Sequence, residues 1–279
     1  MVYKQAGWGE KTQTTTFIIM PDLLNIISTS DKRKKILLLL RDGPKTLGDF
    51  RRTLSFTSTG MLPQIRILEE RNLVKQEGKQ YALTEIGQVV AGHLESLVKT
   101  VEAVEKHEEF WREHDVGDIP SHLLMRINEL YDTRIIESST EELFEPSKES
   151  LENIINSKKI MGISPIVHPV YPEFYLQLLE RETEVSLILT RKAFDKLEKE
   201  YNDKLARGLS FKNGSLYISE KDINIVCIAT DVFFSISLFF KNGVFDSRQD
   251  LISFNKSAIL WGEELFNYYK ERSVKIESL

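Results

Sequence analysis

The stretch that decides the fold is DKRKKILLLLRDGPKTLGDFRRTLSFTSTGMLPQIRILEERNLVKQEGKQYALT, residues 31–84. Its first part predicts a helix that begins near Ser30 or Asp31, because either side chain can accept a hydrogen bond from a free backbone N–H group. The helix is expected to end at the dipeptide Gly43-Pro44, since proline cannot continue a helix.

Two further helices and a hairpin follow in the same stretch. A second helix is predicted from Thr46, with Asp49 placed for a capping box. A third is predicted within residues 58–74, because its apolar residues recur at helical spacing. Those residues are Met61, Ile65 and Leu68. Two extended stretches are joined at Glu77-Gly78, where glycine permits the positive φ of a tight hairpin. This order predicts a winged helix-turn-helix, although any small α+β domain could share the single elements.

The winged helix predicts a set of DNA contacts. Its third helix enters the major groove, so Gln64 is expected to reach adenine and Arg66 guanine or phosphate. Ser58 and Thr59 at the helix start are expected to hold a phosphate together with backbone N–H groups. Basic residues supply attraction that does not depend on sequence. They are Lys45, Arg51, Arg52, Lys75 and Lys79.

The distribution of charge fits this prediction. Residues 21–90 carry 12 Lys or Arg against 8 Asp or Glu, whereas residues 91–279 carry 23 against 33. A basic end on an acidic body suits a protein that presents one end to phosphate.

A long helix after the hairpin carries a possible dimer interface. Thr84 is expected to cap it, and its apolar residues alternate steps of four and three, the spacing of a coiled-coil seam. They are Val90, Leu94, Leu97, Val101 and Val104. The seam predicts a homodimer that places two reading heads on a palindromic site; alternatively, the helix packs only against its own chain. His107 and His114 lack the spacing of a metal site and are expected on a solvated helix face.

From about Thr133 the chain alternates helices and strands and then forms a cluster of strands. This pattern predicts an α/β domain with a mixed sheet. Ligands of such sheets bind beyond the carboxyl ends of strands, and those ends define a candidate effector pocket. It comprises Ser164, His168, Tyr171, Thr190, Arg191 and Asp231. Each of these residues could equally be a cap or turn residue.

Several classes of protein are disfavoured. The chain lacks a glycine-rich phosphate loop, a GxSxG elbow and a cysteine nucleophile near a histidine, so we expect no enzyme, cofactor or metal. Its single cysteine, Cys227, excludes an internal disulfide and is expected to act as a small buried hydrophobe. No apolar run approaches the roughly 18 residues of a membrane span. A cytoplasmic protein without a membrane partner is therefore expected.

The expected fold class is a multidomain α+β protein with four segments. Residues 1–20 form a poorly ordered leader, and Met20 is a candidate natural start. The winged helix occupies residues 21–90, linker and dimerisation helices occupy 91–132, and the α/β effector-sensing domain occupies 133–279.

Segments throughout the chain resemble the archaeal methanogenesis-regulatory winged-helix family. The segments include DKRKKILLLLRDGPKTLGDFRRTL, LTEIGQVVA, FWREHDVGDIPSHLLMRI, GISPIVHP and TDVFFSISLFFKNGVFDSRQDLIS. The resemblance covers roughly residues 21–272. It implies an archaeal transcription regulator, and some family members are tied to methyltransferase genes for methanogenic substrates.

The second domain of this family is similar to effector domains with a phospholipase-D-like fold. The catalytic HxK pair is absent from this sequence, so the resemblance implies sensing. The leading prediction is a homodimeric DNA-binding regulator whose affinity for double-stranded DNA responds to a small-molecule effector. An alternative is an adaptor whose winged helix binds protein. A hydrolase has no motif in its favour.

Overall fold

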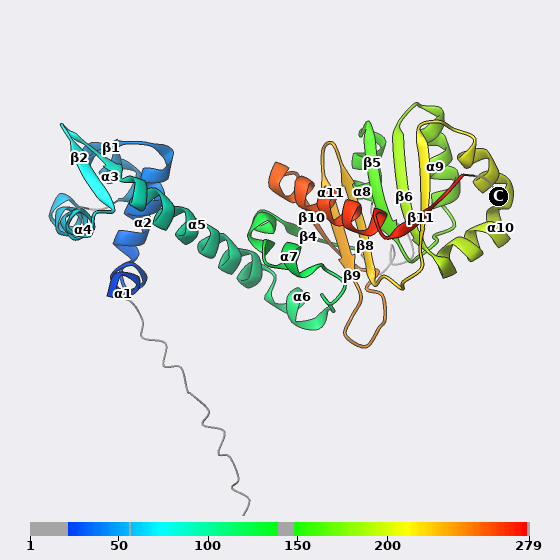
Figure 1. Ribbon diagram of the computed structural model, residues 1–279, viewed down its shortest axis with the longest axis horizontal. Helices are drawn as coiled ribbons and strands as arrows, with labels where there is room; N and C mark the ends of the chain where they lie inside the picture. Colours follow the sequence, from blue (N-terminus) through cyan, green and yellow to red (C-terminus); the bar gives the residue numbers. More distant parts are fainter. Residues whose placement is uncertain (1–21, 56, 139–147, 278–279) are drawn as a thin grey trace, which may run out of the picture. The chain divides into compact units, whose positions relative to one another are not determined.

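The computed structural model describes residues 22–55, 57–138 and 148–277. The expected leader, with Met20, lies outside these residues. Contacts divide the chain into two compact units, Met1–Glu95 and Ser96–Leu279. The α+β fold class is confirmed, with a small helical unit followed by an α/β unit (Figure 1).

The first unit contains short helices and a small antiparallel sheet. Its elements are α1 (Asp22–Ser28), α2 (Asp31–Leu39), η1 (Leu40–Asp42), β1 (Lys45–Thr46), α3 (Leu47–Leu54), α4 (Ser58–Glu70), β2 (Val74–Glu77), β3 (Gln80–Leu83) and the first part of α5 (Glu85–Lys106). The sheet has the order β1-β3-β2. Gly78 joins β2 and β3 with a φ of 63°, which confirms the predicted wing.

Local capping explains where the first helices begin. The Ser30 hydroxyl accepts a hydrogen bond from the Arg33 N–H at 3.4 Å and so caps α2. The Thr46 hydroxyl accepts from the Asp49 N–H at 3.2 Å, and the Asp49 carboxylate accepts from the Thr46 N–H at 2.9 Å. These bonds form the predicted capping box of α3. Gly43 follows η1 with a φ of 103°, as expected for the end of the first helix.

The apolar residues of these helices form the core of the first unit. Phe50 of α3 and Met61, Ile65 and Leu68 of α4 are fully or almost fully buried, as predicted. They pack with Ile36 and Leu37 of α2 and with residues of the wing. This shared core fixes α3 and α4 as a helix-turn-helix pair.

The second unit has an eight-stranded mixed sheet with helices on both faces. Its elements are α6 (Glu108–Glu113), α7 (Ser121–Leu124), η2 (Ile127–Leu130), β4 (Arg134–Glu137), α8 (Lys148–Ile155), β5 (Lys159–Ser164), α9 (Tyr171–Glu180), β6 (Glu184–Thr190), α10 (Arg191–Leu209), β7 (Gly214–Ser219), β8 (Ile225–Thr230), β9 (Phe234–Leu238), β10 (Gln249–Ser253), α11 (Lys256–Lys270) and β11 (Ser273–Ile276). The strand order is β11-β7-β6-β5-β8-β9-β10-β4. Strands β5, β6 and β7 are parallel and their neighbours antiparallel. The mixed sheet is therefore confirmed.

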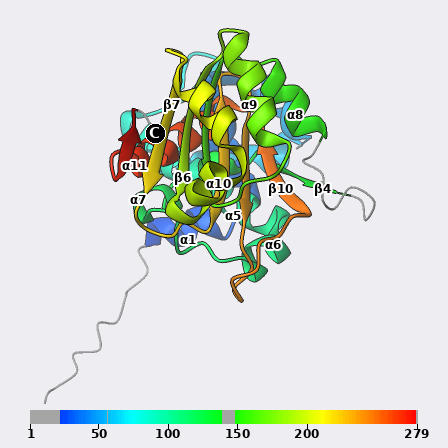
Figure 2. The same cartoon turned by 90° about the vertical axis from the view of Figure 1, so that its right-hand side faces the viewer.

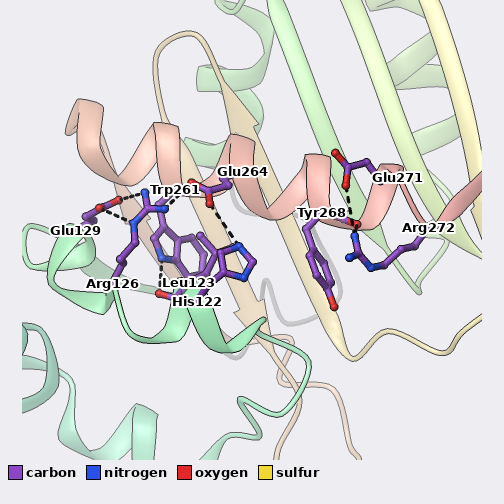
Figure 3. Close-up of polar contacts among 9 residues, drawn as sticks. All are labelled: His122, Leu123, Arg126, Glu129, Trp261, Glu264, Tyr268, Glu271 and Arg272. Carbon is purple, nitrogen blue, oxygen red and sulfur yellow. Dashed lines mark hydrogen bonds and ion pairs between the residues drawn. The ribbon is translucent and has the colours of Figure 1, made fainter.

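Each face of this sheet is covered by different helices (Figure 2). Helices α8, α9 and α10 lie on one face, over Ile160, Val185 and Leu216. Helix α11 covers the other face. Trp261 of α11 is fully buried, and its indole N–H donates to the Leu123 carbonyl at 3.0 Å (Figure 3). The structure thus places Trp261 in the core, as a packing residue.

An ion pair connects the outer side of α11 to the segment that contains α7 and η2. Arg126 donates to the Glu129 carboxylate at 2.9 Å and to the Glu264 carboxylate at 2.7 Å (Figure 3). Residues 96–132 cluster with the second unit, and Phe110 and Leu123 belong to its core. This segment is therefore packed structure, where a separate linker was expected.

The long helix ends just after the last residue of the seam, Val104. Helix α5 stops at Lys106, and the His107 ring is buried, with Nε2 at 3.0 Å from the Thr133 carbonyl. His114 is also buried, with Nδ1 at 2.8 Å from the Phe110 carbonyl and Nε2 at 3.2 Å from the Asp246 carboxylate. The expectation that these histidines are solvated is wrong, because both rings pack against the second unit.

Two strands of the eight-stranded sheet and one helix were not predicted from the sequence. Strands β4 and β11 form its edges, and α1 precedes the first predicted helix. Around the turn Lys241-Asn242-Gly243 the chain forms an isolated bridge, between Phe239 and Phe245. The chain forms its regular strand, β10, only from Gln249.

Candidate functional site

The third helix, α4, presents a polar stripe to solvent. Its exposed residues are spaced by four, three and four positions, so they share one face: Thr59, Pro63, Arg66 and Glu70. Thr57 caps the helix without a side-chain hydrogen bond to its first turn. Ser58 is the first residue of α4, and its side chain lies outside the described part of the structure. In a winged helix this face is the one that enters the major groove.

Gln64 lies beside this stripe and is engaged within the first unit. Its side-chain carbonyl accepts a hydrogen bond from Arg33 Nη1 at 2.7 Å, and the residue is only half-exposed. It follows Met61 by three positions and precedes Leu68 by four, which places it at the edge of the buried stripe. Its expected contact with adenine stays a prediction. Such a contact requires the base to reach the Gln64 amide while its oxygen is bonded to Arg33, or after that bond is broken.

The basic residues around α4 differ in whether their side chains form hydrogen bonds or ion pairs. The side chains of Arg51, Arg66 and Lys79 are exposed and form no hydrogen bond or ion pair with any described residue. Arg52 pairs with Asp49 at 2.5 Å and Lys75 with Glu77 at 2.9 Å. Lys45 donates to the Asp42 carbonyl at 3.2 Å. The first three are therefore the predicted cations without a described partner, and their contacts with phosphate stay a prediction.

The seam residues of α5 fall into two groups. Val90 and Leu94 pack against the core of the first unit. Leu97, Val101 and Val104 have 58%, 43% and 39% of their surface exposed. The sequence pattern could not separate these groups, since core packing and helix pairing use the same spacing.

The second unit contains an apolar cavity of about 130 Å³ between the sheet and helices α9 and α10. Ser164 and Tyr171, two of the predicted pocket residues, line it. The His168 ring lies outside the lining but its centroid is 5.4 Å from that of Tyr171. The structure thus brings these three predicted residues together at the end of β5.

The other predicted pocket residues have structural contacts elsewhere. The Thr190 hydroxyl caps α10 by accepting from the Ala193 N–H at 3.3 Å, and Arg191 pairs with Glu220 at 2.9 Å. The Asp231 carboxylate accepts a hydrogen bond from the Lys158 N–H at 2.9 Å. Lys158 precedes β5 and Ser164 ends it, so Asp231 and Ser164 lie at opposite ends of this strand. Strand β8 runs antiparallel to β5, so the carboxyl end of one strand lies beside the amino end of the other. The structure therefore does not bring Asp231 to Ser164, His168 and Tyr171.

Titratable groups near this cavity are strongly affected by burial. Burial raises the pKa of Tyr171 to about 12, with a further contribution from the Asp250 carboxylate. Burial also raises the pKa of Tyr175. Asp250 is a half-buried acid of β10; burial raises its pKa, against the effect of the hydrogen bond from the Ser237 hydroxyl. Sequence reasoning missed Tyr175, although its place in α9, four residues after Tyr171, puts both rings on one face.

Two family models match most of the described chain. The N-terminal domain of methanogenesis regulatory protein FilR1 matches residues 22–102, and the middle domain of the same protein matches residues 143–272. The chain belongs to the FilR1 family. Both models describe a regulatory protein, and neither describes an enzyme. The expectation of a methanogenesis-regulatory family is therefore confirmed.

A curated relative supports the assignment to the FilR1 family over both domains. It is the methanogenesis regulatory protein FilR1 of Methanothrix harundinacea (strain 6Ac), 27% identical over 259 residues, which are 91% of this chain. The chain spans 58% of the length of that relative.

Solved structures give weaker likenesses. TrmBL2, described as an archaeal chromatin protein with a novel mode of DNA binding, has a TM-score of 0.43 and 12% identity; the match covers 88% of this chain and 92% of that one. NucT from Helicobacter pylori has a TM-score of 0.40 and 11% identity, over 52% of this chain and 98% of that one. At these scores neither likeness carries an argument about function.

Metal sites and membrane spans are two further features considered for the described residues. No group of three or more His, Cys, Asp or Glu side chains there is arranged to hold a metal ion. None of the helices within the described ranges has the length and apolar character needed to cross a membrane.

Proposed function

We propose that the protein is a homodimeric, DNA-binding transcription regulator of an archaeal metabolic pathway, and that an effector bound by its second unit modulates its affinity for DNA. The observation that carries the proposal is the exposed stripe on α4, with Arg66 at its centre and no described partner for its guanidinium. A free, planar guanidinium on the third helix of a winged helix is suited to the paired acceptors of guanine or to phosphate.

The residues around Arg66 supply complementary contacts. Thr59 lies on the same stripe near the start of α4, where backbone N–H groups of the first turn point outward and favour a phosphate. Arg51 on α3 and Lys79 on the wing are exposed cations on either side of this helix in the sequence. Cations at the margins of a recognition helix give affinity without sequence preference. We assign Arg66 the reading of sequence and Arg51 and Lys79 the attraction to the backbone.

Dimerisation is proposed through the exposed apolar face of α5. Leu97, Val101 and Val104 share one side of the helix, and Ile86 falls on the same side because it precedes Val104 by five full helical turns. Exposed apolar residues in coiled-coil spacing fit a second copy of the same helix best, since both copies lose the same apolar surface to water. A dimer would present two copies of α4 to a palindromic site.

Three further parts of the proposal rest on the family resemblance and the cavity. The resemblance implies a phospholipase-D-like fold for the second unit. The cavity beside Tyr171 gives this unit a place for a small-molecule effector. We place such a regulator in the cytoplasm, where it has access to the chromosome.

The test is a gel-shift assay on DNA from upstream of the protein's own gene, with Arg66→Ala compared with the wild type. A bidentate contact to guanine contributes about 1–3 kcal/mol, so we expect the variant to bind specific DNA roughly tenfold more weakly. Binding by the wild type should also weaken steeply with salt. Arg181→Ala removes an exposed arginine of the second unit and is the matched control.

The control should bind as the wild type does, and both variants should keep the thermal unfolding of the wild type. Equal DNA affinity for Arg66→Ala and the wild type would remove the recognition role of α4. Failure of the wild type to bind any duplex would leave the protein-adaptor alternative.

A further inference from the structure

The walls of the cavity in the second unit determine what it can hold. They are mainly apolar and come from the sheet and from α9 and α10. The principal wall residues are Val185, Leu187, Leu189, Leu205, Val226 and Ile228. An ionised ligand entering this space would lose its hydration without a compensating charge, which is costly. The walls therefore select an uncharged, mainly apolar molecule.

Two glycines contribute to the open space. Gly162 of β5 lines the cavity, and a Cβ there would lie 2.8 Å from Leu187 Cδ2 and 4.0 Å from the Tyr175 hydroxyl. Gly208 of α10 lines it from the opposite side, where a Cβ would meet only Leu179 Cδ1, at 3.9 Å. The size of the cavity, about 130 Å³, is close to that of an engineered cavity of about 150 Å³ that binds benzene.

Two of the polar side chains that line the cavity have partners within the protein. The Ser164 hydroxyl donates to the Ile166 carbonyl at 2.7 Å, and the Lys204 ammonium pairs with Glu173 at 2.9 Å. The hydroxyls of Tyr171, Tyr175 and Ser215 also line the cavity and form no hydrogen bond with any described residue, and that of Tyr175 lies over Gly162. A tyrosine hydroxyl can both donate and accept a hydrogen bond, so that of Tyr175 offers a ligand one polar contact.

We propose that this cavity binds a compact, uncharged apolar molecule of about the size of a substituted benzene ring, and that one polar group of that molecule hydrogen-bonds to the Tyr175 hydroxyl. The apolar walls supply the affinity, and Tyr175 selects the ligand that carries the polar group. The proposal rests on the proposed function only for what binding would regulate, since binding itself is a property of the second unit.

The experiment compares 4-methylphenol with toluene, which have the same ring and methyl group and differ by one hydroxyl. Binding to the full chain is measured by NMR titration or calorimetry. We expect the wild type to bind 4-methylphenol several-fold more tightly than toluene, because a net hydrogen bond contributes roughly a factor of ten. Tyr175→Phe should remove this preference and leave the affinity for toluene unchanged.

A second pair of variants tests the location. Gly208→Leu should fill the cavity and abolish binding of both compounds, whereas Gly208→Ala adds one methyl group next to Leu179 and should retain binding. Thermal unfolding confirms that both variants fold, since either side chain favours a helix more than glycine does.

Several results would overturn the proposal. They are no binding of either compound, equal affinity of the wild type for both, a preference that survives Tyr175→Phe, or binding that survives Gly208→Leu. None of these measurements includes DNA. A protein that binds DNA but neither compound would therefore refute this inference and leave the proposed function intact, and the converse result would do the opposite.

Discussion

Among single residues, Asp250 offers a direct test of how burial changes the pKa of a side chain and, through it, the stability of the fold. Burial raises its pKa, the Ser237 hydroxyl lowers it, and the Asp246 carboxylate adds to the rise. Ionising Asp250 is therefore harder in the folded chain than in the unfolded chain, whose reference pKa is about 3.9. Its contribution to stability is full below that reference pKa and is lost as the pH rises through the folded pKa.

We expect Asp250→Asn to raise the free energy of unfolding at pH 7, because the amide keeps an oxygen for the Ser237 hydroxyl and carries no charge. Chemical denaturation at several pH values measures the difference from the wild type, which should shrink toward pH 4. Asp31→Asn is the control: Lys34 lowers the pKa of this exposed acid, so its replacement should give no gain at pH 7. A less stable Asp250→Asn at pH 7 would contradict this account.

Contacts between distant residues limit what the sequence predicts at this scale. The exposed stripe of α4 follows from helical spacing, and Arg66 was identified correctly as exposed. The bond from Arg33 to Gln64 joins residues 31 positions apart, and no local pattern indicates it. Tyr175 was likewise missed, because its importance comes from a cavity that exists only once α9 packs on the sheet.

For whole elements, the sequence predicted the helix ends that are set by local capping. It did not predict the ends and strand directions that are set by packing. The starts of α2 and α3 follow from Ser30 and Thr46, whose side chains bond within three residues. The end of α5 does not, since the buried ring of His107 contacts Thr133, 26 positions further on. The edge at which Asp231 lies depends on the direction of β8, which alternating apolar residues do not encode.

The junction between the wing and α5 depends on one glycine. A Cβ on Gly87 would lie 1.9 Å from the Leu73 carbonyl oxygen, a backbone atom that cannot move aside easily. The Gly87 N–H also donates to the Thr84 hydroxyl at 2.9 Å. We expect Gly87→Ala to destabilise the first unit by about 1–3 kcal/mol, the range typical of overpacking. Thermal or urea unfolding of the full chain measures the loss.

Gly92→Ala is the matched control on the same helix. Its Cβ would approach only the guanidinium of Arg41, at 2.7 Å, which is the end of a flexible side chain. Alanine favours a helix over glycine by about 0.8–1 kcal/mol, and the exposed ion pair of Arg41 with Glu95 contributes about 0–1 kcal/mol. Stability should therefore be kept. Equal stability of the two variants would show that the contact with Leu73 does not constrain α5.

At the level of the whole molecule, the proposed dimer links the first unit to its DNA. A single winged helix reads one half-site, whereas a dimer reads two half-sites about one helical turn apart. The exposed side chains of Leu97, Val101 and Val104 are the described residues best suited to hold two copies together. Burying one such side chain contributes about 1.5–3 kcal/mol, so charges placed there should separate the copies.

We expect the double variant Leu97→Glu, Val101→Glu to be monomeric in analytical ultracentrifugation and to bind a palindromic operator more weakly, with little change on a single half-site. Gln88→Glu, an exposed position on the opposite side of α5, adds charge to the same helix and should stay dimeric. A dimeric double variant would move the interface away from α5. A monomeric wild type that binds the operator fully would remove the dimer and keep DNA reading by α4, because the two properties belong to different helices.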